Sequence, residues 1–222
     1  MKLAFYTDSF HPELGGIQDS IAAQARALGS RGHRILIIAP AAAPDDYRLA
    51  GVERAELDLG PQVHIERLRS VTLPGSTGQS RLALGAGATA DLVAAFAPAL
   101  IHVHTFLTAG WHGARAARRL GVPLIGTNHW AADGFGLYAP PVLQATVARG
   151  FMRAVCRFYR RCALVTTPSR ATADAMRRAG FPRPVAVVSN PIDIDDFRPA
   201  DDDTRQRLRQ ALGLEGPTLV YA

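Results

Sequence analysis

Short apolar runs alternate with helix-like segments along this chain, and that alternation limits its fold more than any other feature. Residues 3–6 and 35–39 are uninterrupted apolar runs of the kind that forms buried parallel strands. Between these runs, apolar residues recur at a helical spacing, at Ile17, Ile21, Ala25 and Leu28. Strand, helix and strand make one βαβ unit, whose crossover we expect to be right-handed.

The same alternation continues through the rest of the chain. Further strands are predicted at residues 63–66, 99–104, 123–127, 163–167 and 184–188. Helices are predicted at residues 80–96, 110–120, 142–161 and 169–179, with Ser169 as a cap for the last. Residues 41–60 and 74–78 have the composition of loops. The predicted fold class is α/β, an open, mostly parallel Rossmann-like sheet with helices on both faces.

Gly15 and Gly16 stand directly before the first predicted helix, after a polar loop that follows the first strand. Glycines let a ligand approach the backbone, and the free N–H groups of a helix start favour an anion. A plain tight turn explains two glycines equally well. The pair therefore suggests an anion site without establishing one.

A second glycine-rich stretch, Gly85 to Ala90, matches the dinucleotide fingerprint G-x-G-x-x-A in form only. No convincing strand precedes it, and residues 92–132 contain no Asp or Glu that would hold a ribose. Close packing of a helix on the sheet explains these small residues better.

The net charge of +6 is carried almost entirely by arginine, because Lys2 is the only lysine. Such a charge favours an anionic partner, although arginine richness can also reflect genomic base composition. The chain has no zinc-ligand spacing, RNA-binding aromatic motif or helix-turn-helix signature, so a nucleic-acid binder is the least favoured function. No apolar run reaches the length of a membrane span and only two cysteines occur, which predicts a cytoplasmic protein.

Three histidines lie within or just after predicted strands. His102 and His104 are two residues apart, so they share one face of their strand, and His129 follows the next strand. Because ligands of open α/β sheets bind at the carboxyl ends of the strands, Gly15, Gly16, His104 and His129 should gather on one edge. No carboxylate lies nearby to support a metal-binding histidine, so we predict no metal site. His102 suits a core position, and His104 suits contact with substrate.

Taken together, these segments resemble the N-terminal half of a GT-B glycosyltransferase of family 4, the retaining group that uses nucleotide sugars. The resemblance covers essentially the whole chain and rests on four stretches in order, residues 6–16, 100–104, 127–129 and 187–193, with Phe197 following. Within the family, the chain is most similar to enzymes that glycosylate membrane lipids. The resemblance implies sugar transfer from a nucleotide-sugar donor to a lipid or small hydroxyl acceptor, with no further cofactor.

The resemblance also implies roles for particular residues. Gly15 and Gly16 would lie under the diphosphate of the donor. His104 would contact the donor sugar near the reacting carbon and position it, and His129 would line the acceptor side. After Asn190 the family usually continues with glycine, whereas this chain has Pro191, which forbids a turn with positive φ.

The second Rossmann-like domain of the family is not represented in this sequence. Residues 1–198 are predicted to form the acceptor-side domain, and residues 199–222 a linker helix with the first strand of a truncated C-terminal domain. Two other functions stay open: a GT-B sugar-nucleotide epimerase, and a non-catalytic anion- or nucleotide-binding module. Continuation of the gene into a second βα domain would favour the transferase.

The predicted helix near residue 150 carries a basic face, with arginines about four residues apart at Arg149, Arg153, Arg157 and Arg160. An apolar stripe runs along another side, from Val147 to Cys162. A basic amphipathic helix can dock on an anionic membrane, which would make the protein peripheral at the inner membrane face. The alternative is a surface helix whose apolar stripe packs on the sheet.

Overall fold

A computed structural model describes residues 1–73, 81–85, 89–130, 139–192, 194–195 and 197–219. The chain divides into two units, Met1–Pro191 and Ile192–Ala222. The predicted surface loop at residues 74–78, and residues 86–88 of the glycine-rich stretch, lie outside the described residues.

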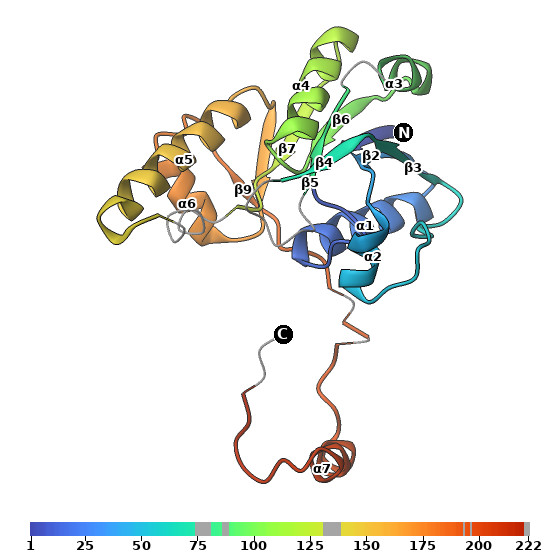
Figure 1. Cartoon of the computed structure of the whole chain (residues 1–222), viewed down its shortest axis with the longest axis vertical. Coiled ribbons are helices and arrows are strands. Elements are labelled where there is room, and N and C mark those ends of the chain that lie inside the picture. Colours follow the sequence, from blue (N-terminus) through green and yellow to red (C-terminus); the bar gives the residue numbers. More distant parts are fainter. Residues whose placement is uncertain (74–80, 86–88, 131–138, 193, 196, 220–222) are drawn as a thin grey trace. The chain divides into compact units, whose positions relative to one another are not determined.

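The first unit is built on a seven-stranded sheet with the strand order β3-β2-β1-β6-β7-β8-β9 (Figure 1), and every neighbouring pair is parallel. Its strands are β1 (Lys2–Tyr6), β2 (Arg34–Pro40), β3 (Val63–Leu68), β6 (Leu100–Val103), β7 (Leu124–Thr127), β8 (Leu164–Thr167) and β9 (Ala186–Val187). Its helices are α1 (Gly16–Ser30), α2 (Pro44–Ala50), α3 (Ala90–Phe96), α4 (Thr108–Leu120), α5 (Gln144–Tyr159) and α6 (Arg170–Arg178), with a 3₁₀ helix at Pro141–Leu143. The predicted fold class is therefore confirmed.

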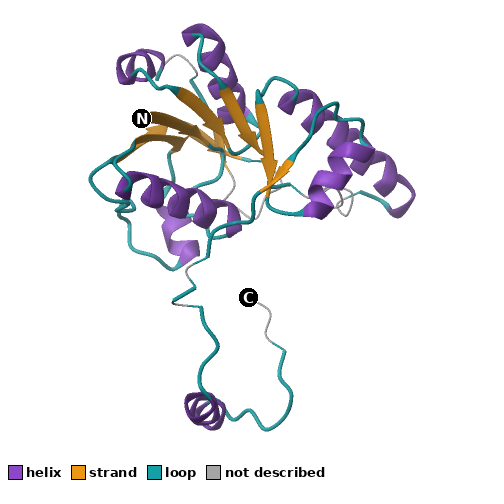
Figure 2. Cartoon of the chain, turned by 180° about the vertical axis from the view of Figure 1, so that it is seen from behind, coloured by secondary structure: helices purple, strands orange, loops and turns teal. Residues whose placement is uncertain are grey.

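Both faces of the central strands are buried, which explains their unbroken apolar runs. Leu3 and Phe5 of β1 pack with Ile21 of α1 on one face. Ala4 and Tyr6 belong to a larger core on the other face, which takes in residues of α4 and α5. The two views of the chain show α1 and α4 on opposite faces of the sheet (Figure 2).

Two glycines without room for a side chain set how closely α4 and α5 approach the sheet. A Cβ on Gly113 of α4 would lie 2.7 Å from Val103 Cγ1, and one on Gly126 of β7 would lie 2.6 Å from Tyr159 Cδ1. In addition, the Tyr159 hydroxyl donates to the Thr127 carbonyl oxygen at 2.7 Å. Both helices are therefore held tightly against the strands that carry the histidines.

The strand order reverses direction between β1 and β6. From β1 the chain passes outward to β2 and β3, and from β6 it passes the other way to β7, β8 and β9. Such a switch point leaves a crevice at the carboxyl ends of the two central strands, where open α/β sheets bind their ligands. The loops after Tyr6 and Val103 flank that crevice.

Two predictions from the sequence were wrong. Residues 81–83, expected in a helix from 80 to 96, form β5 (Arg81–Ala83), which pairs antiparallel with β4 (Ser70–Thr72). Arg81 contacts Asp46 and Ser70 at 3.0 and 2.7 Å, and these tertiary contacts override local helix preference. The expected loop at 41–60 contains α2, because the Asp46 carboxylate accepts from the Ala43 N–H at 2.7 Å and so caps the helix.

The second unit contains α7 (Asp202–Ala211), where a helix was predicted. Asp201 caps it by accepting from the Thr204 N–H at 2.8 Å. Residues 216–219, expected to begin a strand, are not in a strand in the part of the chain that is described. No helix over the described residues combines the length and apolar character that crossing a bilayer requires.

Candidate functional site

Asp8 and Thr105 join the loops that follow the two central strands. The Asp8 carboxylate accepts hydrogen bonds from Thr105 Oγ1 at 2.6 Å, Thr108 Oγ1 at 2.8 Å and the Ala109 N–H at 2.7 Å. The Asp8 N–H in turn donates to Thr105 Oγ1 at 2.9 Å. Asp8 is buried, and its negative charge lies at the start of α4, where the helix dipole favours an anion. This carboxylate therefore holds the two loops and α4 in one arrangement.

The three histidines form a row beside this network. His102 and His104 share one face of the chain as predicted, with ring centroids 4.0 Å apart, and His129 stacks on His104 at 5.8 Å. His102 Nε2 lies 2.7 Å from Thr127 Oγ1, which lies 2.7 Å from Thr166 Oγ1. His102 is thus a satisfied internal histidine, as the sequence suggested.

His104 and His129 differ from His102 in their hydrogen bonding. Both ring nitrogens of His104 and both of His129 are buried and have no hydrogen-bond partner among the described residues. Native proteins rarely leave buried polar atoms unpaired, so each such group requires an explanation. A ligand that supplies the missing partners is one such explanation.

The surroundings of these histidines keep them uncharged at neutral pH. Burial, together with the neighbouring His129, lowers the pKa of His102 to about 3. Burial also holds the pKa of His104 well below its usual range, with contributions from His102 and His129. The pKa of His129 falls to about 4, again because of burial. The row therefore offers neutral imidazoles, which can each donate and accept a hydrogen bond.

Gly15 and Gly16 lie at the start of α1, and no side-chain hydrogen bond caps this helix at Gly15. A Cβ at Gly15 would lie 3.0 Å from Gln18 Oε1, so glycine permits the close path of the loop. A cavity of about 290 Å³ is lined by both glycines, by Thr105 and by Trp130. Thr105 and Trp130 directly follow His104 and His129 in the chain, so the cavity borders the two histidine-bearing loops, although neither histidine lines it.

Asn190 also reaches this edge from far along the chain. Its Nδ2 donates to the Gly16 carbonyl oxygen at 3.3 Å. The stretch that contains Asn190 and Pro191 was singled out in the sequence, and this contact brings it to the first residue of α1. The segment that follows β9 thus contacts the backbone of Gly16.

The arginines of α5 lie apart from this cavity. Arg149, Arg153, Arg157 and Arg160 are all exposed. Val155 and Phe158 of the apolar stripe are buried in the core, as the packing alternative predicted. Val147, near the start of the stripe, is 37% exposed. The basic face therefore remains available for a partner.

Sequence reasoning missed Asp8 and Thr105 as parts of this site. Their positions could have indicated this role, because Asp8 comes soon after β1 and Thr105 soon after β6. These two strands are neighbours in the sheet. Among the described residues, no three His, Cys, Asp or Glu side chains are grouped so that they could hold a metal ion.

Comparison with known proteins identifies the family. The sequence profile of Glycosyltransferase Family 4 matches residues 14–196. The chain belongs to glycosyltransferase family 4. It is 30% identical over 202 residues to a GDP-mannose-dependent alpha-mannosyltransferase of Mycobacterium tuberculosis, a match that covers 90% of this chain and 50% of that protein. A protein of the same name from Corynebacterium glutamicum is 25% identical over 185 residues, covering 82% and 41% of the two chains.

Solved structures agree with this family 4 assignment at the level of the fold. Anabaena HepE in complex with UDP-glucose superposes with a TM-score of 0.56 at 20% identity, covering 96% of this chain and 50% of that one. A transferase from Siraitia grosvenorii in complex with UDP gives 0.53 at 11% identity, covering 97% and 56%. The chain thus spans about half the length of the relatives it matches. The resemblance to the N-terminal part of a family 4 glycosyltransferase is confirmed.

Proposed function

We propose that this chain is the acceptor-side part of a glycosyltransferase that moves a sugar from a nucleotide-sugar donor to a hydroxyl acceptor with retention. In this reaction the acceptor hydroxyl oxygen forms a bond to the anomeric carbon as the bond from that carbon to the nucleoside diphosphate breaks, and the hydroxyl proton leaves with the diphosphate. Family membership and the names of the curated relatives support the proposal. The same relatives make GDP-mannose the first donor to test, and the family match favours transfer over the epimerase alternative.

The single observation that links the proposed reaction to this site is the imidazole of His104, whose two buried nitrogens have no hydrogen-bond partner among the described residues. A neutral imidazole has one N–H donor and one acceptor nitrogen, and a sugar hydroxyl can pair with either. Because the pKa of His104 is far below neutrality, the ring would orient the sugar and its developing charge as an uncharged group. We assign His104 as the catalytic contact to the donor sugar.

The glycine loop and His129 complete the proposed arrangement. The uncapped start of α1 at Gly15 and Gly16 would receive the diphosphate through backbone N–H groups and the positive end of the helix dipole. His129 stacks on His104 and would line the acceptor side. The nucleotide sugar is a co-substrate, and we propose no additional cofactor. The remaining donor contacts would come from a second Rossmann-like domain, in keeping with the greater length of the relatives.

The test compares His104→Ala with His64→Ala in the full-length protein, using GDP-mannose as donor. His64 is a histidine with 66% of its side chain exposed and serves as the matched control. Loss of a contact made chiefly in the transition state corresponds to about 2–4 kcal/mol, so kcat should fall roughly 30- to 1,000-fold for His104→Ala. Near-normal turnover by a folded His104→Ala variant would refute the assignment, as would an equal loss in the control.

We further propose that the acceptor is a membrane lipid and that α5 docks the protein on an anionic membrane surface. Arg149, Arg153, Arg157 and Arg160 supply exposed positive charge, and each basic residue near an anionic leaflet contributes about 1 kcal/mol. The variant Arg149→Glu/Arg153→Glu/Arg157→Glu should lose binding to anionic vesicles and keep its fold. Binding that ignores both salt and these substitutions would instead place the arginines on an ordinary solvated face.

A further inference from the structure

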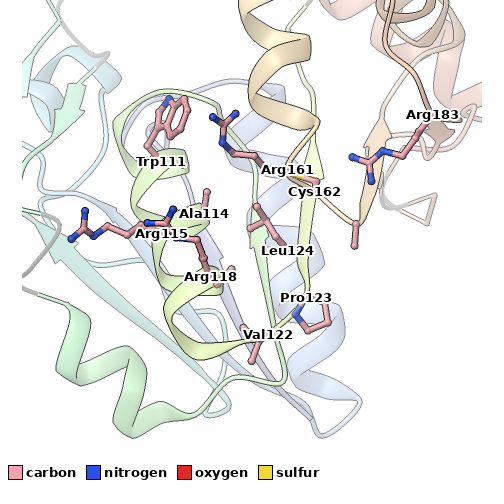
Figure 3. A pocket seen from close by; sticks show the side chains of 12 residues that line it. Trp111, Ala114, Arg115, Arg118, Val122, Pro123, Leu124, Arg161, Cys162 and Arg183 are labelled. Carbon is pink, nitrogen blue, oxygen red and sulfur yellow. The ribbon is translucent and has the colours of Figure 1, made fainter.

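A second, larger cavity lies away from the histidine row, on the face of the sheet that α4 covers (Figure 3). It has a volume of about 810 Å³, and we call it the α4 groove. Its lining includes Trp111, Arg115, Arg118, Leu124, Arg161 and Arg183. Its other lining residues include those just before β7 and β8, so it extends toward the amino ends of these strands. That is the end opposite to the proposed sugar site.

Two of its four arginines are held in place by the protein. The guanidinium of Arg161 lies over the Trp111 ring at 4.3 Å and donates to the Arg157 carbonyl oxygen at 2.7 Å. Arg183 donates to the Arg160 carbonyl oxygen at 2.8 Å. Figure 3 shows Arg183 across the groove from α4. Fixed guanidinium groups lose less conformational freedom when an anion binds.

The other two arginines, Arg115 and Arg118, are exposed on α4, where Figure 3 shows them on the opposite side of the groove from Arg183. They are three residues apart, so they project from neighbouring positions on the helix. Among the described residues that line the groove, none is acidic. Four positive charges therefore face a cavity with no carboxylate in its wall.

The floor between the arginines is apolar. Leu124, Val122 and Pro123 contribute to it from β7 and the turn before it, and Cys162 contributes from the turn before β8. A free inorganic anion would leave this surface without a partner. The lining therefore fits a ligand that combines a phosphate with an apolar portion.

The chain concentrates its charge excess in this region. Residues 92–183 contain twelve arginines and only two acidic residues, Asp133 and Asp174. By comparison, the whole chain has 25 basic and 19 acidic residues. An anionic leaflet would attract this part of the protein over a distance of about one Debye length, roughly 8 Å at physiological salt.

From these observations, we propose that the α4 groove binds the phosphate headgroup of an anionic phospholipid, with the glycerol and upper acyl chain on its apolar floor. Guanidinium forks match phosphate oxygens in two-bond geometry, and a half-exposed tryptophan suits a membrane interface. Trp111 already stacks on Arg161 and packs edge-on against Phe158 at 5.3 Å, which disfavours its use as a stacking platform for a nucleobase. This proposal rests on the membrane association proposed above and adds a second, separate point of attachment.

The first test compares sedimentation with vesicles of phosphatidylcholine alone and of phosphatidylcholine mixed with phosphatidylglycerol. The variant Arg115→Ala/Arg118→Ala removes two groove arginines, and Arg26→Ala/Arg31→Ala removes two exposed arginines at α1, on the other face of the sheet. About 1 kcal/mol per basic residue corresponds to roughly five-fold each, so binding of the groove variant to anionic vesicles should fall about 30-fold. The α1 control should bind nearly as well as the unaltered protein.

Several results of this test would overturn the groove proposal. One is equal binding of anionic vesicles by the groove variant and the unaltered protein. Another is loss of binding only in the variant Arg149→Glu/Arg153→Glu/Arg157→Glu, which would leave the α5 docking proposal standing. Failure of the unaltered protein to bind anionic vesicles would overturn lipid docking altogether. Sugar transfer to a soluble acceptor is measured separately, so the proposed catalytic function is judged independently of these outcomes.

The second test uses Trp111 as a reporter inside the groove. The chain has two tryptophans, so Trp130→Phe leaves Trp111 as the single tryptophan, which excitation at the red edge of the absorption band selects over the tyrosines. Vesicles containing phosphatidylglycerol brominated near the upper acyl chain should quench this fluorescence, and they should not do so after Arg115→Ala/Arg118→Ala. An equal change in Trp111 fluorescence with inorganic phosphate alone would show that the groove binds a free anion and not a phospholipid. Displacement of the vesicles by polyglutamate, without any bromine quenching, would point to an acidic protein partner instead.

Discussion

Replacing Asp8 with alanine should destabilise the protein more than any change to an exposed carboxylate. The substitution removes the acceptor of three hydrogen bonds, from Thr105 Oγ1, Thr108 Oγ1 and the Ala109 N–H. These donors would then be left in a buried site with no carboxylate to receive them. The start of α4 would also lose its only negative neighbour in this network.

The expected magnitude follows from the number and type of these bonds. A hydrogen bond to a charged group contributes about 1.5–3 kcal/mol, and three bonds to one carboxylate are not additive. Leaving three buried donors without their common acceptor lowers the free energy of unfolding by about 3–5 kcal/mol. Asp8→Asn keeps one oxygen for Thr108 and Ala109, so its loss should be smaller, about 1–2 kcal/mol. Either loss is a large part of a typical total of about 5–15 kcal/mol.

Urea unfolding followed by far-UV circular dichroism measures this effect. With a slope of about 2 kcal/mol per M, Asp8→Ala should lower the midpoint by about 2 M. Asp45→Ala is the matched control, because its carboxylate is 70% exposed and pairs with exposed Arg48 at 3.3 Å. A midpoint for Asp8→Ala no lower than that of the control would refute the assignment of Asp8 as the clamp between the two loops.

Three further results are expected. Gly126→Ala should lower the free energy of unfolding by about 1–3 kcal/mol, because the new methyl would lie 2.6 Å from Tyr159 Cδ1. Its control, Gly150→Ala, places a methyl with nothing within 4 Å and should raise the free energy of unfolding by about 0.5–1 kcal/mol. Equal effects of the two substitutions in urea titrations would contradict the tight packing at Gly126. Lowering the pH from about 6.5 to about 4 should destabilise the fold, because the unfolded chain binds protons that buried His102 (pKa about 3) and His129 (pKa about 4) do not. Each histidine contributes up to about 1.4 kcal/mol per pH unit, and a urea midpoint that stays constant over this range would show that these rings are not buried as neutral groups. Finally, this chain by itself should fold without catalysing transfer from GDP-mannose, and robust turnover by it would disprove the need for a second domain.

Local sequence patterns determined the strands and most helices of this protein. Buried parallel strands need apolar side chains on both faces, so β1 and β2 appear as unbroken apolar runs. The alternation of side chains along a strand also placed His102 and His104 on one face, because they are two residues apart. These features depend on residues close together in the chain, which is why the sequence alone predicted them.

Contacts between distant residues decided the rest. Asp8 and Thr105 are 97 residues apart, and their role became visible only when β1 and β6 proved to be neighbours. Arg81 likewise turned a predicted helix into a strand through Asp46, 35 residues away. The α4 groove joins arginines from three separate segments around one apolar floor. Each of these features arises from hydrogen bonding, charge pairing or surface burial between elements, and no local pattern records which elements will meet.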